Sequence, residues 1–334
     1  MGKRNIFVDI FKLALVFLIV CIHFHPYFEH YAIFRIGVPS FFIISGYFQY
    51  KNSNDNLNKE RKFIKESLKY ILIALLIYIV YDLIIAYKDN QSISNTFTCF
   101  FYKDFILNFI TFNLPITSGY HLWYLIALFV VSIIHYFIVK YNKTYIYKYT
   151  FLLLIIPFFF SGLLFRLNNE FTSTAYTRNA IFTGLPLFSI GYELRRRNKE
   201  RTILSLCIFL GVGLIFFYTQ HLERVYIFKT QVEMYISSII SSIFLVLFFV
   251  NLPCVKSKIY YLIFGTKASL FTYIFHLMIG KICIKYYEYE RSWMVCLISF
   301  FVSLGLAISI NGMTVLVKHL YDKHKSKTEE HFIN

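Results

Sequence analysis

The chain has 334 residues, of which 57% are hydrophobic, 21% are aromatic and only 16% are charged, and its net charge is +16. Soluble domains carry about 25% charged residues, so this composition excludes an ordinary soluble protein. Apolar stretches recur along the whole sequence with short polar gaps, and each helical crossing of a bilayer needs about 20 apolar residues. The sequence therefore predicts an all-α integral protein that crosses a membrane many times.

About ten membrane-spanning helices are predicted along the chain. The second is interrupted by Arg35 and Pro39, and the sixth is short and contains Gly184 and Pro186. Short spans interrupted by Gly or Pro are common where membrane proteins build sites. The predicted spans are 6–25, 33–50, 68–87, 120–139, 149–165, 180–194, 202–219, 235–251, 262–280 and 293–317.

The first span follows Lys3 and Arg4, as the apolar run of a secretory signal peptide would. No small-residue cleavage site follows it, so we expect it to be retained as a helix. We expect a membrane domain over residues 1–318 and a polar cytoplasmic tail over 319–334.

The 34 Lys and Arg residues are distributed unevenly between the polar gaps. Most of them fall on one side of the membrane if the N-terminus is cytoplasmic, and cytoplasmic loops carry the excess of positive charge. Both termini are therefore predicted to be cytoplasmic. A nucleic-acid footprint would cluster on one folded face instead, so we expect no nucleic-acid partner, and contact of the basic loops with membrane lipid.

The cysteines and short motifs of the sequence give no sign of metal or cofactor binding. The six cysteines have neither metal nor redox spacing, and the sequence shows no Gly-rich phosphate loop and no nucleophile elbow. We therefore expect no metal site and no permanently bound cofactor.

The first two spans contain ionisable residues that are costly at membrane depth, namely Lys12, His23 and Arg35. Lys12 and His23 are about 16 Å apart along one helix and lie on almost the same face. After the turn that follows Pro26, the second span runs back inward and returns Arg35 to about the depth of His23. We expect His23 and Arg35 to share a cavity in the outer half of the bundle, with Lys12 well below them.

Each of these residues also has a structural explanation. His23 could be a core histidine that is hydrogen-bonded to a neighbouring helix. Lys12 could extend to the inner interface with Asp9 as its partner, and Arg35 could be an outer interfacial anchor. The functional explanation depends on the ability of histidine to take and return a proton near pH 7.

Four motifs follow one another in a specific order. The first motif consists of Lys12, His23, Arg35-Ile-Gly-Val-Pro39 and Ile44-Ser45-Gly46-Tyr47-Phe48, and the second is His121-Leu-Trp123-Tyr124. The third consists of Arg178-Asn179, Phe182-Thr-Gly184-Leu-Pro186 and Gly191-Tyr192. The fourth is Ser269-Leu-Phe-Thr-Tyr273-Ile-Phe-His276. Their order resembles the membrane-bound acyltransferase 3 family. Members of that family have about ten helices and typically pass an acyl group to sugars of the cell envelope.

The resemblance implies a membrane O-acyltransferase that moves an acyl group, expected to be acetyl, from cytoplasmic acyl-CoA to a hydroxyl of an envelope glycan or lipid-linked sugar. His23 would be the general base or the acyl carrier. If His23 proved dispensable, His121 or His276 would take that role. The residues implied to bind the oxyanion or the acceptor are Arg35, His121, Trp123 and Arg178.

The donor would dock at the basic inner side of the membrane domain. The residues implied to bind acyl-CoA are Lys12, Arg61, Lys62, Lys65 and Lys69. Family members commonly have Arg-x-x-Arg and then Pro at the third helix, whereas this sequence has Lys62-Phe-Ile-Lys65 with no following Pro. Lysine meets phosphate as a point charge and cannot make the bidentate fork of arginine.

Two other functions fit parts of the sequence. A transporter or transport-like domain for a small molecule or a glycan would also use a His and a Lys at membrane depth, as a proton relay. A structural subunit of a glycan synthesis complex would leave Lys12, His23 and Arg35 without an explanation. No fused esterase-like domain is expected, so the chain would finish the transfer itself or with a separate partner.

Overall fold

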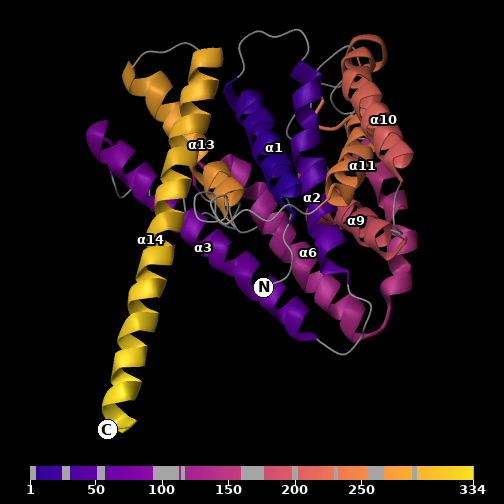
Figure 1. The fold of residues 1–334 in the computed structure, drawn as a ribbon. Coiled ribbons are helices and arrows are strands. Elements are labelled where there is room, and N and C mark those ends of the chain that lie inside the picture. Colours follow the sequence, from indigo (N-terminus) through magenta and orange to yellow (C-terminus); the bar gives the residue numbers. More distant parts are fainter. Residues whose placement is uncertain are drawn as a thin grey trace. The chain divides into compact units, whose positions relative to one another are not determined.

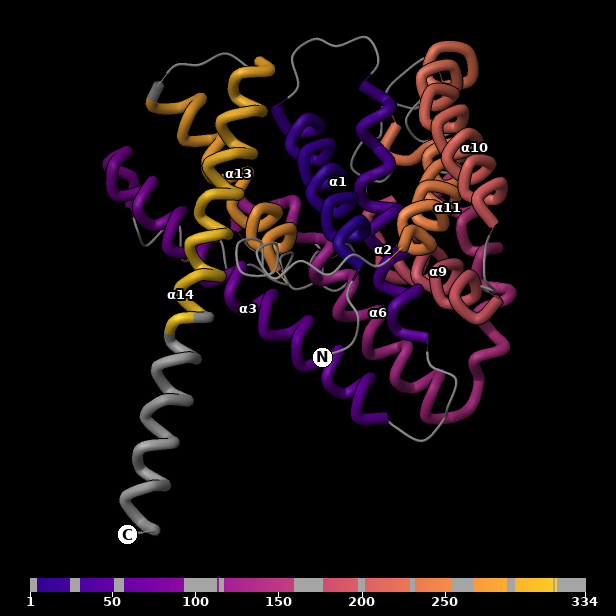
Figure 2. The backbone as a smooth tube through the Cα atoms, in the orientation of Figure 1, coloured from indigo at the N-terminus to yellow at the C-terminus, as the bar shows by residue number. Residues whose placement is uncertain are grey.

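In the computed structural model, the structure describes residues 5–24, 31–50, 57–92, 113, 117–158, 177–197, 202–228, 232–253, 267–287 and 292–333. Every regular element among these residues is a helix, as predicted. The chain forms two compact units, and Figure 1 and Figure 2 show their helices coloured by position in the sequence. Unit 1 consists of Met1–Tyr27 and Leu252–Asn334, and unit 2 of Phe28–Asn251.

Unit 1 brings the two ends of the chain together. It contains α1 (Ile6–Phe24), α13 (Ala268–Tyr287) and α14 (Trp293–Ile333), and each of these helices packs on the other two. Gly280 of α13 lies against the ring of Phe24, which occupies the place of a side chain there. Asn5 joins the segments, because its side-chain amide donates to the carbonyl oxygen of Leu252 at 3.2 Å.

Unit 2 contains the remaining helices. The α-helices are α2 (Gly37–Gln49), α3 (Leu57–Lys88), α6 (Trp123–Lys140), α9 (Leu185–Arg197), α10 (Ile203–Leu222) and α11 (Ile236–Asn251). The shorter elements are the 3₁₀ helices η1 (Tyr31–Ile36), η2 (Tyr120–Leu122), η3 (Thr144–Lys148) and η4 (Thr150–Leu154), and the π-helices η5 (Ala180–Gly184) and η6 (Glu223–Phe228). Helix α2 packs on α9 and α11, α3 packs on α6, and α10 packs on α11.

Helices α2 and α9 run parallel to each other. The ring of Phe42 lies against Gly184 just before α9, and the ring of Tyr50 just after α2 lies 5.1 Å from that of Tyr192. The first part of α2 therefore contacts the start of α9, and the end of α2 contacts a later part of α9. As a result, the segments that precede α2 and α9 lie at the same end of unit 2.

Two glycines allow this pair to pack closely. A side chain at Gly46 would overlap the backbone oxygen of Phe188, and one at Gly191 would overlap that of Ile43. Small residues at helix interfaces let backbones approach each other, which is a common source of helix association in membranes. The glycines of the pairs Gly46-Tyr47 and Gly191-Tyr192 therefore serve the packing of α2 against α9.

Seven helices of the described residues are long and apolar enough to cross a membrane. They are Ile6–Phe24, Tyr31–Gln49, Leu57–Lys88, Tyr120–Lys140, Ile203–Phe228, Ala268–Tyr286 and Trp293–Thr314. The predicted spans 180–194 and 235–251 correspond to shorter helices, and residues 159–165 of the predicted span 149–165 lie outside the described residues. A multi-pass membrane protein follows, and the count of ten stays a prediction.

Two helices continue beyond the apolar stretch that was predicted as their span. Helix α3 begins at Leu57, before the predicted span 68–87, and α14 continues to Ile333, beyond the predicted span 293–317. Both extensions are rich in Lys, Glu and similar residues, which have high helix propensity and can extend a helix into water. The domain boundary at 318 and the side of the termini stay predictions.

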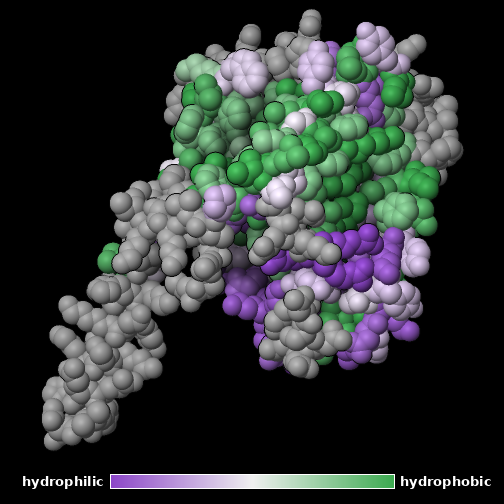
Figure 3. Space-filling model, turned by 45° about the vertical axis from the view of Figure 1, so that its right-hand side comes forward, coloured by the Kyte–Doolittle hydropathy of each residue, from purple (hydrophilic) through white to green (hydrophobic). Residues whose placement is uncertain are grey.

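The surface of α3 carries an apolar stripe. Leu72, Leu76, Val80 and Ile84 recur every four residues and are exposed, with Leu76 at 63%. On the face drawn in Figure 3, hydrophobic side chains cover a broad area and hydrophilic ones gather along one border of it. Exposed apolar stripes of this kind suit contact with lipid tails and not with water.

Candidate functional site

His23 stacks on a second histidine within unit 1. Its half-buried ring lies in the last turn of α1, and the centroid of the His276 ring on α13 is 5.4 Å away with an interplanar angle of 29°. The candidate catalytic residue therefore has an imidazole as its neighbour. The sequence analysis placed His276 in a motif but considered it as the catalytic residue only if His23 proved dispensable.

The orientation of His276 is set by its hydrogen bond. The ring is fully buried, and Nδ1 lies 2.6 Å from the carbonyl oxygen of Tyr273. Because a carbonyl can only accept, Nδ1 carries the hydrogen and Nε2 is the acceptor nitrogen of the neutral ring. Ser299 of α14 donates its hydroxyl to the carbonyl oxygen of His276 at 2.5 Å, so all three helices of unit 1 contribute to this arrangement.

Lys12 pairs locally on α1. Its Nζ lies 3.6 Å from Oδ1 of Asp9, one turn earlier, and a quarter of its side chain is exposed. This is the partner expected in the structural explanation of Lys12. Binding of the donor by Lys12 stays a prediction.

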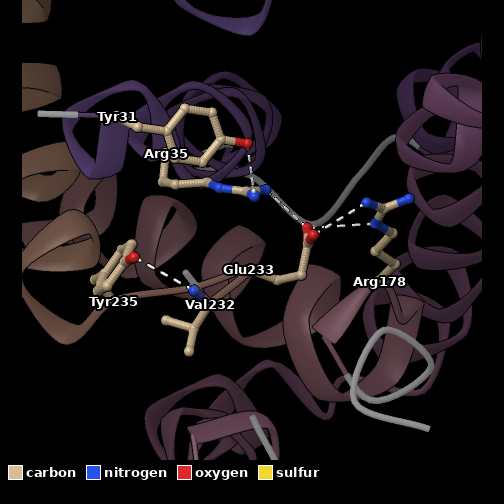
Figure 4. Close-up of polar contacts among 6 residues, drawn as sticks. All are labelled: Tyr31, Arg35, Arg178, Val232, Glu233 and Tyr235. Carbon is tan, nitrogen blue, oxygen red and sulfur yellow. Dashed lines mark hydrogen bonds and ion pairs between the residues drawn. The ribbon is translucent and has the colours of Figure 1, made fainter. Parts of the chain in front are cut away.

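Arg35 and Arg178 meet at one carboxylate in unit 2. Nη1 of Arg35 donates to Oε2 of Glu233 at 2.8 Å, and Nη2 of Arg178 donates to Oε1 at 3.1 Å. The Nε of Arg178 adds a bond to Oε2 at 3.3 Å, which makes this pair bidentate. Figure 4 shows the two arginines reaching Glu233 from opposite sides. We call Arg35, Glu233 and Arg178 the ion triad.

The local folds explain why these three residues meet. Arg35 precedes α2 and Arg178 precedes η5 and α9, which run in parallel. Asn179 orders the second segment, because its Oδ1 accepts the backbone N–H groups of Ile181 at 2.8 Å and Phe182 at 3.2 Å. Glu233 lies in the short segment between η6 and α11.

Two tyrosines surround the ion triad. Nη2 of Arg35 donates to the hydroxyl of Tyr31 at 3.0 Å, and its guanidinium lies 5.2 Å from the centroid of that ring. The hydroxyl of Tyr235 accepts the backbone N–H of Val232 at 3.3 Å, which holds the segment that carries Glu233 (Figure 4). Burial raises the pKa of Glu233, but Arg178 and Arg35 lower it more, and the result is a pKa of about 2. The carboxylate is therefore ionised at neutral pH.

Sequence reasoning missed Glu233, because it lies in a polar gap between two predicted spans. A usable signal existed, since an arginine at membrane depth needs an acidic partner, and the chain has only 18 Asp and Glu residues. The sequence alone could not choose among them.

His121 lies in η2 and Trp123 begins α6, and both are buried. The His121 ring packs on Tyr78 of α3 with a centroid distance of 5.4 Å, and the Trp123 ring lies 6.4 Å from Phe42 of α2. Asp82 of α3 holds the segment before them, because its carboxylate accepts the backbone N–H of Ser118 at 2.9 Å. Binding of the acceptor by His121 and Trp123 stays a prediction.

Apart from Lys12, the basic residues predicted to bind the donor lie on the outside of α3. They are Arg61, Lys62, Lys65 and Lys69, and each is exposed. Lys59 differs from them, since its Nζ donates to the backbone oxygens of Phe48 at 2.7 Å and Gln49 at 2.9 Å. It therefore satisfies carbonyl groups that the end of α2 leaves without partners.

A buried polar pair, which sequence reasoning also missed, lies at the other end of α6. Nδ1 of His135 is 2.6 Å from the hydroxyl of Tyr147, and both side chains are buried. The rings of Tyr147 and Tyr192 are 4.8 Å apart. Burial, the neighbouring Tyr192 and the nearby Glu60 raise the pKa of Tyr147, so its phenol stays protonated.

His23 belongs to unit 1 and Arg35 to unit 2. The shared cavity that was expected for them therefore stays a prediction. Within the units, the structure brings His23 together with His276, and Arg35 together with Arg178.

The helices and polar groups described above define a multi-pass helical membrane protein with ionisable residues placed in its helices. The sequence matches the model of the acyltransferase domain family over residues 5–312. The chain belongs to this family.

Comparison with known proteins adds one relative. The chain is similar to an amino-acid racemase from Enterococcus faecalis, with 28% identity over 235 residues that cover 61% of this chain and 31% of the relative. The chain thus spans about a third of the length of that protein. No solved structure matches the chain.

Proposed function

We propose that the chain is a membrane acyltransferase of the cytoplasmic membrane that moves an acyl group, expected to be acetyl, from acyl-CoA to a hydroxyl of an envelope carbohydrate. The observation that supports this most directly is the stacked pair of His23 and His276, inside the part of the chain that matches the family. A half-buried histidine with a fixed neighbour suits proton transfer better than a surface anchor would.

The reaction would begin at the acceptor hydroxyl. His23 would take the hydroxyl proton while the oxygen attacks the thioester carbonyl of the donor. The tetrahedral oxyanion would then collapse, the carbon–sulfur bond would break, and the proton would pass from His23 to the leaving thiolate. If His23 carries the acyl group instead, its ring nitrogen attacks the thioester, the carbon–sulfur bond breaks, and the CoA thiolate leaves with the proton of the ring. The acceptor hydroxyl would then attack the acyl-imidazole, the carbon–nitrogen bond would break, and the hydroxyl proton would pass to the released ring nitrogen.

His276 would act as a positioning residue for His23. Its Nδ1 is committed to the oxygen of Tyr273, so its ring presents one fixed face to His23. A reacting group that is held in place avoids part of the entropic cost of orientation. Arg35 and Arg178 would serve the acceptor or the oxyanion together with Glu233, and Arg61, Lys62, Lys65 and Lys69 would meet the phosphates of the donor.

The experiment that tests this proposal measures CoA release and acylated glycan in the same membranes. Cells with and without the chain are compared by mass spectrometry of their envelope glycans, and membranes with His23→Gln serve as the matched inactive sample. Loss of acylation in both the deletion and the variant is expected. An unchanged acyl pattern in cells that demonstrably lack the chain would overturn the proposal.

Transport of a small molecule or a glycan without covalent chemistry is the second candidate function. Two ionisable residues on one membrane helix, Lys12 and His23, favour it, since such groups mark proton relays in transporters. In this case a proton relay would use His23 and Lys12. Substrate flux into vesicles that contain the purified chain but no acyl-CoA would distinguish the two functions.

A further inference from the structure

The ion triad has an unbalanced charge. Two guanidinium groups face one carboxylate, and with the pKa of Glu233 at about 2 the triad has a net charge of +1 at neutral pH. Among the described residues, Glu233 is the only carboxylate that pairs with Arg35 or Arg178. A partly buried charge without a partner is costly, so this place favours an additional anion.

The arginines also retain donors that could bind one. A guanidinium has five N–H groups, and Arg35 directs its Nη1 to Glu233 and its Nη2 to Tyr31. Its Nε is buried and has no hydrogen-bond partner among the described residues. Arg178 directs its Nε and Nη2 to Glu233, which leaves Nη1. Carboxylates and phosphates are the acceptors that match such donors best.

The triad is accessible and held in place. The side chains of Arg35, Arg178 and Glu233 are 12%, 21% and 24% exposed, so a ligand can reach them while most of their surface is shielded from water. The ring of Tyr31 supports one guanidinium and the bidentate bond to Glu233 supports the other. Preorganised donors lose less conformational entropy when a ligand binds.

We infer that the ion triad is a subsite for an oxyanion of the acceptor, so that the acceptor is an acidic carbohydrate bearing a carboxylate or a phosphate. This inference rests on the proposed function for the acceptor being a carbohydrate. The recognition itself involves only Arg35, Arg178 and their neighbours, and needs no acyl-CoA.

The test is a binding experiment on the full chain in lipid nanodiscs without acyl-CoA. Glucuronate probes a carboxylate, glucose 1-phosphate probes a phosphate, and glucose is the neutral control. We expect at least one acidic sugar to bind about 10-fold more tightly than glucose, which corresponds to one charge-assisted hydrogen bond. The acidic sugar that binds more tightly identifies the anion.

Three variants define the subsite. Arg178→Gln should lose about 10-fold or more in affinity for the acidic sugar, and Arg178→Lys, which keeps the charge without the fork, should lose less. Glu233→Gln should bind the acidic sugar more tightly than the wild type, because the internal competitor for the arginines has lost its charge. A triad that only holds helices together predicts no binding in any of these proteins.

Arg195→Gln is the matched control. Arg195 contacts the hydroxyl of Tyr47 at 3.1 Å and lies 5.2 Å from the centroid of that ring, as Arg35 does with Tyr31, but at the other end of the parallel helix pair. The variant Arg195→Gln changes the net charge by the same amount as Arg178→Gln and should leave sugar binding unchanged.

Equal binding of glucose and both acidic sugars by a folded wild type, or an equal loss in Arg195→Gln and Arg178→Gln, would overturn the inference. Failure of acyl transfer with preserved binding of an acidic sugar would overturn the proposed function alone. Acyl transfer to a neutral carbohydrate, with no binding of either acidic sugar, would overturn the inference alone.

Discussion

The imidazole of His23 lies face to face with that of His276, with ring centroids 5.4 Å apart and planes 29° from parallel. One ring comes from the last turn of α1 and the other from α13, so the contact joins the two ends of the chain. His276 is held by the backbone at its Nδ1. The pair is therefore a defined arrangement of one candidate catalytic group and one support.

Replacement of His23 tests its chemical role. His23→Ala and His23→Gln should each lower acyl transfer per folded molecule by about 100-fold to 10,000-fold, since neither side chain can transfer a proton at neutral pH. The measurement is turnover of detergent-purified protein, with the amount of folded protein determined by size-exclusion chromatography. Near-normal turnover of His23→Gln would assign His23 to the packed core and transfer the hypothesis to His121 or His276.

Replacement of His276 tests its positioning role. His276→Phe keeps a flat ring beside His23 but removes the bond from Nδ1 to Tyr273, so the ring can rotate. We expect kcat to fall by up to about 100-fold with little change in KM for the donor. Ser299→Ala, which removes the bond to the backbone oxygen of His276, should have a smaller effect. A purely structural role would lower the yield of folded protein and leave its kcat intact.

The ion triad predicts a dependence of stability on pH. Burial opposes ionisation of Glu233, but Arg178 and Arg35 lower its pKa from 4.5 to about 2. Because the pKa is lowered in the folded state, the stabilisation is complete above pH 4.5 and is lost as the pH falls from 4.5 towards 2.

This dependence is measured by thermal unfolding in detergent. Glu233→Gln should be less stable than the wild type at pH 7, by an amount between the ~1 kcal/mol of an exposed pair and the ~3 to 5 kcal/mol of a buried one. The difference should shrink as the pH falls below 4.5, because the carboxyl of the unfolded wild type takes up its proton there while the folded carboxyl stays ionised until about pH 2. A difference that is constant from pH 7 to pH 3 would contradict the ion pairing.

Variants of the basic residues on α3 distinguish residues that bind the donor from a residue that caps the end of α2. The double variant Lys62→Gln with Lys65→Gln should raise KM for acyl-CoA by at least about 10-fold at unchanged stability, because both side chains are exposed. Lys59→Gln should lower stability by about 1 kcal/mol, because its bonds to the end of α2 are lost. An unchanged KM in the double variant would exclude these lysines from the donor site.

The side of the termini is tested by labelling. A tag at the C-terminus and single cysteines placed at residues 195–197 and beside Arg178 are probed with a membrane-impermeant reagent in intact cells. The C-terminus and residues 195–197 should be protected and the position beside Arg178 should react, as the positive-inside rule predicts. An accessible C-terminus would reverse the topology and the proposed side of the donor.

The sequence by itself determined the properties that depend on local composition. Apolar runs of sufficient length predict membrane helices wherever they occur, and most of the predicted spans coincide with helices of the structure. The order of the motifs around His23, Arg35 and Arg178 was enough to indicate the family that covers residues 5–312. Helix ends such as Leu57 were less predictable, because charged residues with high helix propensity continue a helix beyond its apolar core.

Only the tertiary structure decided which polar residues meet. Glu233 joins Arg35 from 198 positions away and Arg178 from 55 positions away, and His276 comes to His23 from the other end of the chain. Hydropathy defines which residues enter the membrane, but not the neighbour that each helix packs against. That choice depends on the fit of facing surfaces, such as Gly46 and Gly191 between α2 and α9, because apolar helices in lipid associate through close packing and polar contacts.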